Sequence, residues 1–276
     1  MVNLTSSLPG GTAVKYHALA TAFAFFCLAS PVHGQTASPA ERFQNAVTWL
    51  DSRFGPEDEY RAPPAVDADA AEKFQDLVSS MEVYGSEDFP ASEQSYLSVC
   101  VPLTKLTARY ANAGAAAIPG IRENTPAASA QLSHLQDRNV LAYQDETTIL
   151  TALDVVCMAL HTQVFTEDWE AMSAATRSTF AADIRGMQHG AMVMLDGLAI
   201  IADNQAISRH NQDIAVAALS GYADVYASIL TVPDRKALLA AIRKNAPGLA
   251  KQYPAQFAAI SKAFARTDCA GLCTVR

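Results

Sequence analysis

The residues that separate the regular segments of this sequence most constrain its fold, because they are typical of helix caps rather than of hairpin turns. Ser38-Pro39-Ala40-Glu41 is a capping box: Ser38 and Glu41 each accept a backbone N–H at the start of a helix, and proline suits the first helical position. Apolar residues then recur at helical spacing, and strand-like alternation of Val, Ile and Thr is scarce. The sequence therefore predicts an all-α fold with no β-sheet.

The helical spacing continues through most of the chain. After the first helix, which Gly55-Pro56 ends, we expect helical segments over 67–84, 90–114, 126–141, 144–165, 166–203, 208–230, 233–245 and 254–266. Thr166-Glu167-Asp168 is typical of a helix start, and Pro102 predicts a kink or break. These segments predict a multi-helix bundle of roughly eight to ten helices.

Two stretches interrupt the pattern. Residues 57–66 form an acidic, proline-bearing loop that includes Glu57-Asp58-Glu59, which could meet a basic partner or simply be solvated surface. Residues 115–125, with Pro119-Gly120, are the least regular part after the leader. They are interpreted as an internal domain boundary or as a long surface loop.

The first 34 residues have the pattern of a secretory signal peptide. Lys15 supplies a positive charge, residues 18–30 are almost wholly apolar, and Val32 and Gly34 suit a signal-peptidase site before Gln35. The apolar run is too short to span a bilayer. We therefore expect a mature all-α domain over 35–276 that is periplasmic or secreted.

Composition narrows the classes of partner. Half of the residues are apolar, which is ample for a core, and the net charge is −8. An acidic chain lacks the basic surface that nucleic acids and anionic lipids require. No second apolar run is long enough for a membrane span. The expected partner is another exported protein, and the sequence leaves the oligomeric state open.

Four cysteines follow the predicted leader, which in an oxidising compartment indicates two disulfides. Cys269 and Cys273 lie four apart with a glycine between them, so we expect them to pair, which leaves Cys100 with Cys157. The longer bridge would stabilise the fold by about 4 kcal/mol on a chain-entropy estimate. The alternative for Cys269 and Cys273 is a soft-metal or redox pair, for which the sequence offers no histidine partner nearby.

No catalytic or cofactor-binding motif is present. The sequence lacks the nucleophile elbow, the zinc-protease helix, the phosphate and dinucleotide loops, and the C-x-x-C pair. Asp67-Ala68-Asp69 begins like a calcium loop but has Glu72 at the glycine position and Val78 at the final acidic position. We interpret it as acidic residues at a helix N-terminus.

One set of residues could bind a metal. Asp154 and His161 lie seven residues apart on one predicted helix face, and His189 and Asp196 repeat the spacing in reverse order. An antiparallel hairpin centred on residue 175 would bring the aspartates together and the histidines together. Such a site suits zinc or iron, and the nearby methionines 187, 192 and 194 would suit copper.

A simpler interpretation competes with the metal site. Asp168 and Asp203 extend the two series by seven more residues, which is typical of solvent-facing stripes or satisfied polar pairs. The helix boundary expected near Thr166 also lies well before residue 175. Methionines near an apolar face are commonly core residues.

Three functional hypotheses remain. The first is an exported, non-catalytic protein that binds a protein partner, as an inhibitor, immunity or adaptor protein does. The second is a metal-dependent enzyme or metal-binding bundle that uses Asp154, His161, His189 and Asp196. The third is a carrier of a small apolar ligand, with Tyr222 and Tyr226 in a groove or in the core.

Overall fold

The computed structural model describes residues 37–56, 61–81, 93–123 and 125–275. The predicted signal peptide and the triplet Glu57-Asp58-Glu59 lie outside the described residues. Within the described part the chain is all α-helical and has no strand, as the sequence predicts. The α-helices are α2 (Pro39–Ser52), α3 (Ala68–Met81), α4 (Glu93–Ala111), α5 (Pro126–Ala142), α6 (Gln144–Ala171), α7 (Ala174–Asp203), α8 (Arg209–Ile229), α9 (Val232–Asn245), α10 (Leu249–Gln252) and α11 (Pro254–Phe264). Two 3₁₀ helices, η2 (Ala115–Ala117) and η3 (Gly271–Thr274), complete the described elements.

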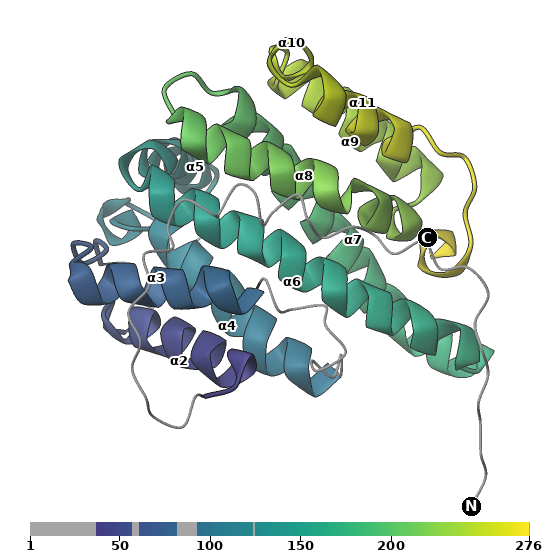
Figure 1. Ribbon diagram of the computed structural model, residues 1–276, viewed down its shortest axis with the longest axis horizontal. Coiled ribbons are helices and arrows are strands. Elements are labelled where there is room, and N and C mark those ends of the chain that lie inside the picture. The colour runs from purple at the N-terminus through teal and green to yellow at the C-terminus, as the bar shows by residue number, and fades with distance from the viewer. Residues whose placement is uncertain (1–36, 57–60, 82–92, 124, 276) are drawn as a thin grey trace, which may run out of the picture.

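Helix α6 is central in the bundle (Figure 1). It packs against α4 on one side and α8 on the other, and α7 also contacts both α6 and α8. Helix α2 packs against α4 and α3, and α3 also contacts α6, while α9 and α11 pack on the α7–α8 side. The buried apolar side chains form one continuous core, from Phe43 in α2 to Val275 near the C-terminus. The core therefore includes residues on both sides of the irregular stretch 115–125.

The predicted caps explain where several helices begin. Ser38 and Glu41 form the capping box at α2, with the Ser38 Oγ accepting from the Glu41 N–H and the Glu41 carboxylate accepting from the Ser38 N–H. Asp67 Oδ1 accepts from the Ala70 N–H at the start of α3, and its carboxylate pairs with Arg53 at 2.9 Å. The acidic residues at 67 and 69 are therefore part of a helix start, as the sequence indicates.

Two details of the helix boundaries differ from expectation. Helix α6 continues through Thr166 to Ala171, so the boundary predicted at residue 166 is wrong. The Thr166 hydroxyl donates to the Thr162 carbonyl within the helix at 2.7 Å, and Trp169 is buried in the next turn. The real boundary is at Ser173, whose Oγ caps α7 by accepting from the Thr176 N–H. Helix α4 runs through Pro102, so the predicted break is absent and the kink stays a prediction.

Both predicted cysteine pairs lie at disulfide distance. Cys100 of α4 pairs with Cys157 of α6, with 5.7 Å between their Cα atoms. Cys269 pairs with Cys273, with 5.6 Å between theirs. Two disulfides fit a protein that folds in an oxidising compartment. None of the helices in the described part of the chain combines the length and the hydropathy that crossing a bilayer requires.

Candidate functional site

Asp154 is a buried carboxyl group at the interface between α6 and α4. It is 5% exposed and lies beneath Thr104, which reaches the surface. The distance from Thr104 Oγ1 to Asp154 Oδ1 is 3.1 Å, and that from Thr107 Oγ1 to Oδ2 is 2.8 Å. Burial raises the pKa of Asp154 to about 7, although the hydrogen bonds from Thr107 and Thr104 act in the opposite direction. This carboxyl group therefore changes its charge near neutral pH.

The two threonine hydroxyls can also accommodate the neutral form of Asp154, which burial favours. Thr104 Oγ1 also lies 3.0 Å from the Cys100 carbonyl, and Thr107 Oγ1 lies 3.0 Å from the Leu103 carbonyl. Each hydroxyl has a single proton, so two threonines facing a carboxylate must both turn away from those carbonyls. A protonated Asp154 instead donates to one threonine, which then donates to its own carbonyl. The neutral carboxyl thus satisfies one more acceptor.

The cluster of Asp154, Thr104 and Thr107 is suited to taking up a proton on the Asp154 carboxyl rather than to binding a substrate. The carboxyl joins two helices that the Cys100–Cys157 disulfide also joins, and Cys157 follows Asp154 by one helical turn. Thr104 and Thr107 were not predicted as functional residues. Their spacing places both on one face of α4, but nothing in the sequence shows that a carboxyl 47 to 50 residues away faces them.

The other predicted metal ligands have different surroundings. Asp196 Oδ2 accepts from Asn245 Nδ2 of α9 at 2.8 Å, so the two aspartates bond to opposite sides of the bundle. His189 is exposed on α7, and the side chain of His161 lies outside the described part of the structure. Among the described side chains, no three His, Cys, Asp or Glu residues lie together as metal ligands would. Asp154 is buried, so it is not part of an exposed stripe, and its hydrogen bonds to Thr104 and Thr107 fit the other half of that interpretation, a satisfied polar contact. The four-residue metal site stays a prediction.

One feature of the predicted hairpin agrees with the structure. Thr162 Oγ1 of α6 lies 3.7 Å from Met187 Sδ of α7, and the midpoint between these positions is within one residue of 175. The helices therefore run antiparallel in nearly the expected register, because the true boundary at Ser173 is close to that centre.

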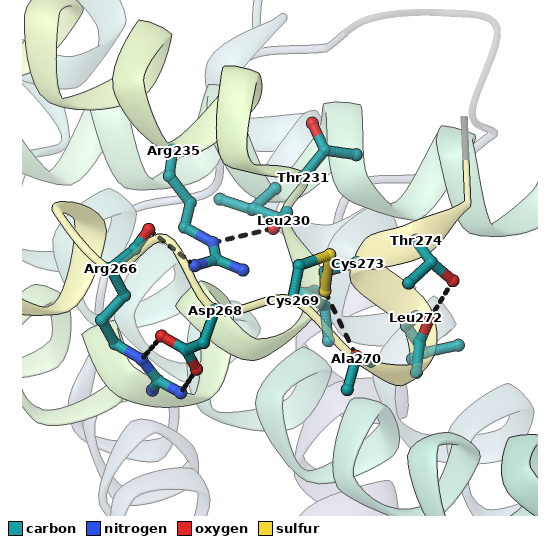
Figure 2. The surroundings of a disulfide bond; sticks show 12 residues. Leu230, Thr231, Arg235, Arg266, Asp268, Cys269, Ala270, Leu272, Cys273 and Thr274 are labelled. Atoms are coloured by element: carbon teal, nitrogen blue, oxygen red, sulfur yellow. Dashed lines mark hydrogen bonds and ion pairs between the residues drawn. A yellow bond between two sulfur atoms is a disulfide. The ribbon is translucent and has the colours of Figure 1, made fainter.

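Arg235 is a buried cation near the second disulfide (Figure 2). It is 1% exposed; its Nε donates to the Leu230 carbonyl and its Nη1 to the Arg266 carbonyl, both at 2.9 Å. Burial lowers the pKa of Arg235, and the negative charge of Asp268 opposes that shift. Leu230 is the C-cap residue that follows α8, where the helix dipole is negative, so the guanidinium lies where a positive charge is favoured.

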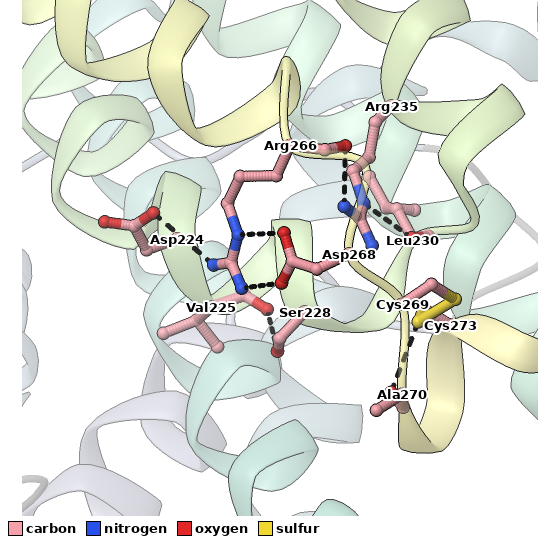
Figure 3. Close-up of polar contacts among 10 residues, drawn as sticks. All are labelled: Asp224, Val225, Ser228, Leu230, Arg235, Arg266, Asp268, Cys269, Ala270 and Cys273. Carbon is pink, nitrogen blue, oxygen red and sulfur yellow. Dashed lines mark hydrogen bonds and ion pairs between the residues drawn. A yellow bond between two sulfur atoms is a disulfide. The ribbon is translucent and has the colours of Figure 1, made fainter. Parts of the chain in front are cut away.

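An ion pair at the surface lies next to Arg235 (Figure 3). Arg266 holds the Asp268 carboxylate with two bonds, from Nε at 3.1 Å and from Nη2 at 2.5 Å, and Asp224 lies 3.8 Å from its Nη1. The hydrogen bond from Arg266 lowers the pKa of Asp268 to about 2. Together with Arg235, these contacts attach the segment before Cys269 to the end of α8. We assign them a structural role.

The outer face of α7 is the described surface with the clearest features of a binding site. We define the outer α7 face as Gly186, Gly190, Val193, Gly197 and Ile200, which share one side of the helix. Val193 is 60% exposed and Ile200 42%, and they are two of only four large apolar side chains that are exposed in the described chain. A Cβ added at any of the three glycines would meet no atom within 4 Å. The glycines therefore serve no packing contact within the described chain.

Tyr222 and Tyr226 are core residues, which confirms one of the two interpretations made for them. Tyr226 is fully buried, and its hydroxyl donates to the Val155 carbonyl at 2.7 Å.

The chain matches no protein-family model, and comparisons with curated proteins and with solved structures find no match for it.

Proposed function

We propose that this protein is an exported, non-catalytic binding protein that contacts another protein chain through the outer α7 face. The observation that supports this proposal is the combination of exposed Val193 and Ile200 with three glycines whose Cβ positions are open. Glycine in an exposed helix costs about 1 kcal/mol relative to alanine, so three on one face are unfavourable unless a partner approaches closely. Exposed apolar residues grouped on one face are typical of protein interaction sites.

The buried ionisable groups Asp154 and Arg235 have structural partners, which favours binding over catalysis. Asp154 is covered by α4, and Arg235 is held by two backbone carbonyls. The two disulfides suit an extracytoplasmic protein. The acidic charge of the chain favours a protein partner over nucleic acid.

Site-specific photo-cross-linking tests this proposal in cells that produce the full chain. A photoreactive amino acid replaces Val193, and a matched control replaces Leu141, which is 40% exposed on α5. We expect a discrete adduct from position 193 and none from position 141. Absence of an adduct at 193 in cells and with purified protein would contradict the proposal.

A further inference from the structure

Large and small residues alternate along the outer α7 face in such a way that the face can fit against a second copy of itself that runs in the opposite direction. Gly190, Val193, Gly197 and Ile200 are spaced by three, four and three residues, so the spacing is the same in both directions. Reversing the order exchanges each glycine with an apolar side chain. A second helix of the same sequence, running antiparallel, therefore presents a side chain wherever the first presents a gap.

We infer that the outer α7 face binds the same face of a second copy of this chain, with the two α7 helices antiparallel. This inference rests on the proposed function and names its partner. With the two-fold axis at residue 195, Val193 lies opposite Gly197 of the second copy, and Ile200 lies opposite Gly190 of the second copy. Absence of a Cβ at both glycines lets the helix axes approach closely and lets each apolar side chain enter a gap.

A parallel arrangement fits the pattern less well. It would place each residue beside its own copy, so that Val193 meets Val193 of the second copy and Gly190 meets Gly190 of the second copy. Large side chains would then hold the helices apart at the positions where glycine leaves empty space. The antiparallel arrangement fills those gaps and also aligns the helix dipoles favourably.

Charged residues along one flank of α7 would lie at the edge of this antiparallel pair. Arg185 is exposed in the N-terminal half, and Asp203 is the last residue of the helix, where its negative charge opposes the helix dipole. Asp203 is held in place by the Gly248 N–H and by Gln252 Nε2, both at 2.9 Å. In the antiparallel pair, Arg185 of each chain lies within two residues of the level of Asp203 of the other. Asp196 is on the same flank and lies within two residues of the level of its own copy, so two carboxylates also come near each other close to the axis. The arrangement therefore rests on the fit of apolar side chains into the glycine gaps and not on charge.

The first test measures self-association of the mature, disulfide-bonded protein by analytical ultracentrifugation. We expect a concentration-dependent dimer. Val193→Glu should raise the dimer dissociation constant at least about tenfold, because two carboxylates enter the interface. The matched control Leu141→Glu should leave it unchanged. A wild-type monomer up to about 1 mM, or equal effects of the two variants, would overturn the inference.

Exchanging the valine at 193 with the glycine at 197 tests whether large and small residues fit together across the interface, because this test can restore binding as well as remove it. Gly197→Val should weaken the dimer, because valine then meets Val193 of the second copy. The double variant Val193→Gly, Gly197→Val restores one large and one small residue at each contact, so it should recover dimerisation. Because the space around position 197 is open, each chain is expected to fold. Failure of the double variant to associate would contradict the pairing.

The helix direction is tested with a spin label at Ala182→Cys in the predicted mature chain, where this position is exposed and the four native cysteines are already paired. The antiparallel dimer places the two labels about 40 Å apart along the helices, and a parallel dimer places them about 10 Å apart. The shorter distance would overturn the inference. A cross-linked adduct from position 193 that contains a different protein would also overturn it, while keeping the proposed function; no adduct together with a monomer would overturn both.

Discussion

Replacing Asp154 with asparagine should change how the stability of this protein depends on pH. The carboxyl is buried, and its pKa rises from 3.8 in a solvated reference to about 7 in the folded chain. Such a difference of about three units corresponds to about 4 kcal/mol of folding free energy. Between these two pKa values the folded state binds more protons than the unfolded state. The stability that the protonated Asp154 adds to the folded state is fully present below the pKa of the unfolded chain and is lost as pH rises through about 7.

The asparagine of the Asp154→Asn variant resembles the neutral carboxyl in shape and does not titrate. The free energy of unfolding of both proteins should be measured by urea denaturation from pH 4 to pH 8, with the disulfides intact. Relative to wild type, the variant should gain about 1.4 kcal/mol per pH unit between about pH 5 and 6.5, and about 4 kcal/mol over the whole range. Taking the difference between the proteins cancels the groups that they share.

A second variant separates the effect of burial on the pKa of Asp154 from the effect of hydrogen bonding. The hydrogen bond from Thr107 lowers the pKa of Asp154, so Thr107→Val should move the pH-dependent window upward. A stability difference between wild type and Asp154→Asn that stays flat from pH 4 to pH 8 would refute the reasoning. A difference that favours wild type as pH rises would refute it as well.

Three further expectations concern other parts of the molecule. Arg235→Met should lower the free energy of unfolding by roughly 2 to 4 kcal/mol in urea denaturation, because two buried carbonyls lose their donor; an unchanged value would show that water replaces the guanidinium. Gly186→Ala should stabilise the dilute monomer by up to about 1 kcal/mol in thermal or urea unfolding, and destabilisation would contradict the open space around this glycine. If the predicted metal site exists, elemental analysis should find stoichiometric metal that disappears in a His161→Ala, His189→Ala double variant; metal-free wild type whose stability is unchanged by chelation would end that hypothesis.

The sequence was informative where local chemistry decides the structure. The capping box at Ser38 and the pairing of the four cysteines depend on residues close in sequence or on elimination, and both are found in the structure. The boundary predicted at Thr166 was wrong because a threonine hydroxyl can also bond to the carbonyl four residues earlier. Burial of Trp169 continues the helix, and the sequence around residue 166 does not show that burial.

The candidate sites depended on contacts between distant helices. Seven-residue spacing placed Asp154 on a helix face but could not show which element covers that face, because α6 has neighbours on several sides. Arg235 gave no signal at all, since its partners are backbone carbonyls of Leu230 and Arg266. The glycines of α7 are visible in the sequence, but only the structure shows that the space beside them is open.

The Cys100–Cys157 bridge has a consequence for proteolysis. The two cysteines lie on either side of the turns between α4 and α5, where residues 119 and 121–123 are exposed or half-exposed. A protease that cuts these turns leaves both fragments covalently joined and packed in one core. The nicked protein would gain only the mass of one water and would separate into two chains after reduction and unfolding. A single backbone cut in this connection is therefore insufficient to dismantle the molecule.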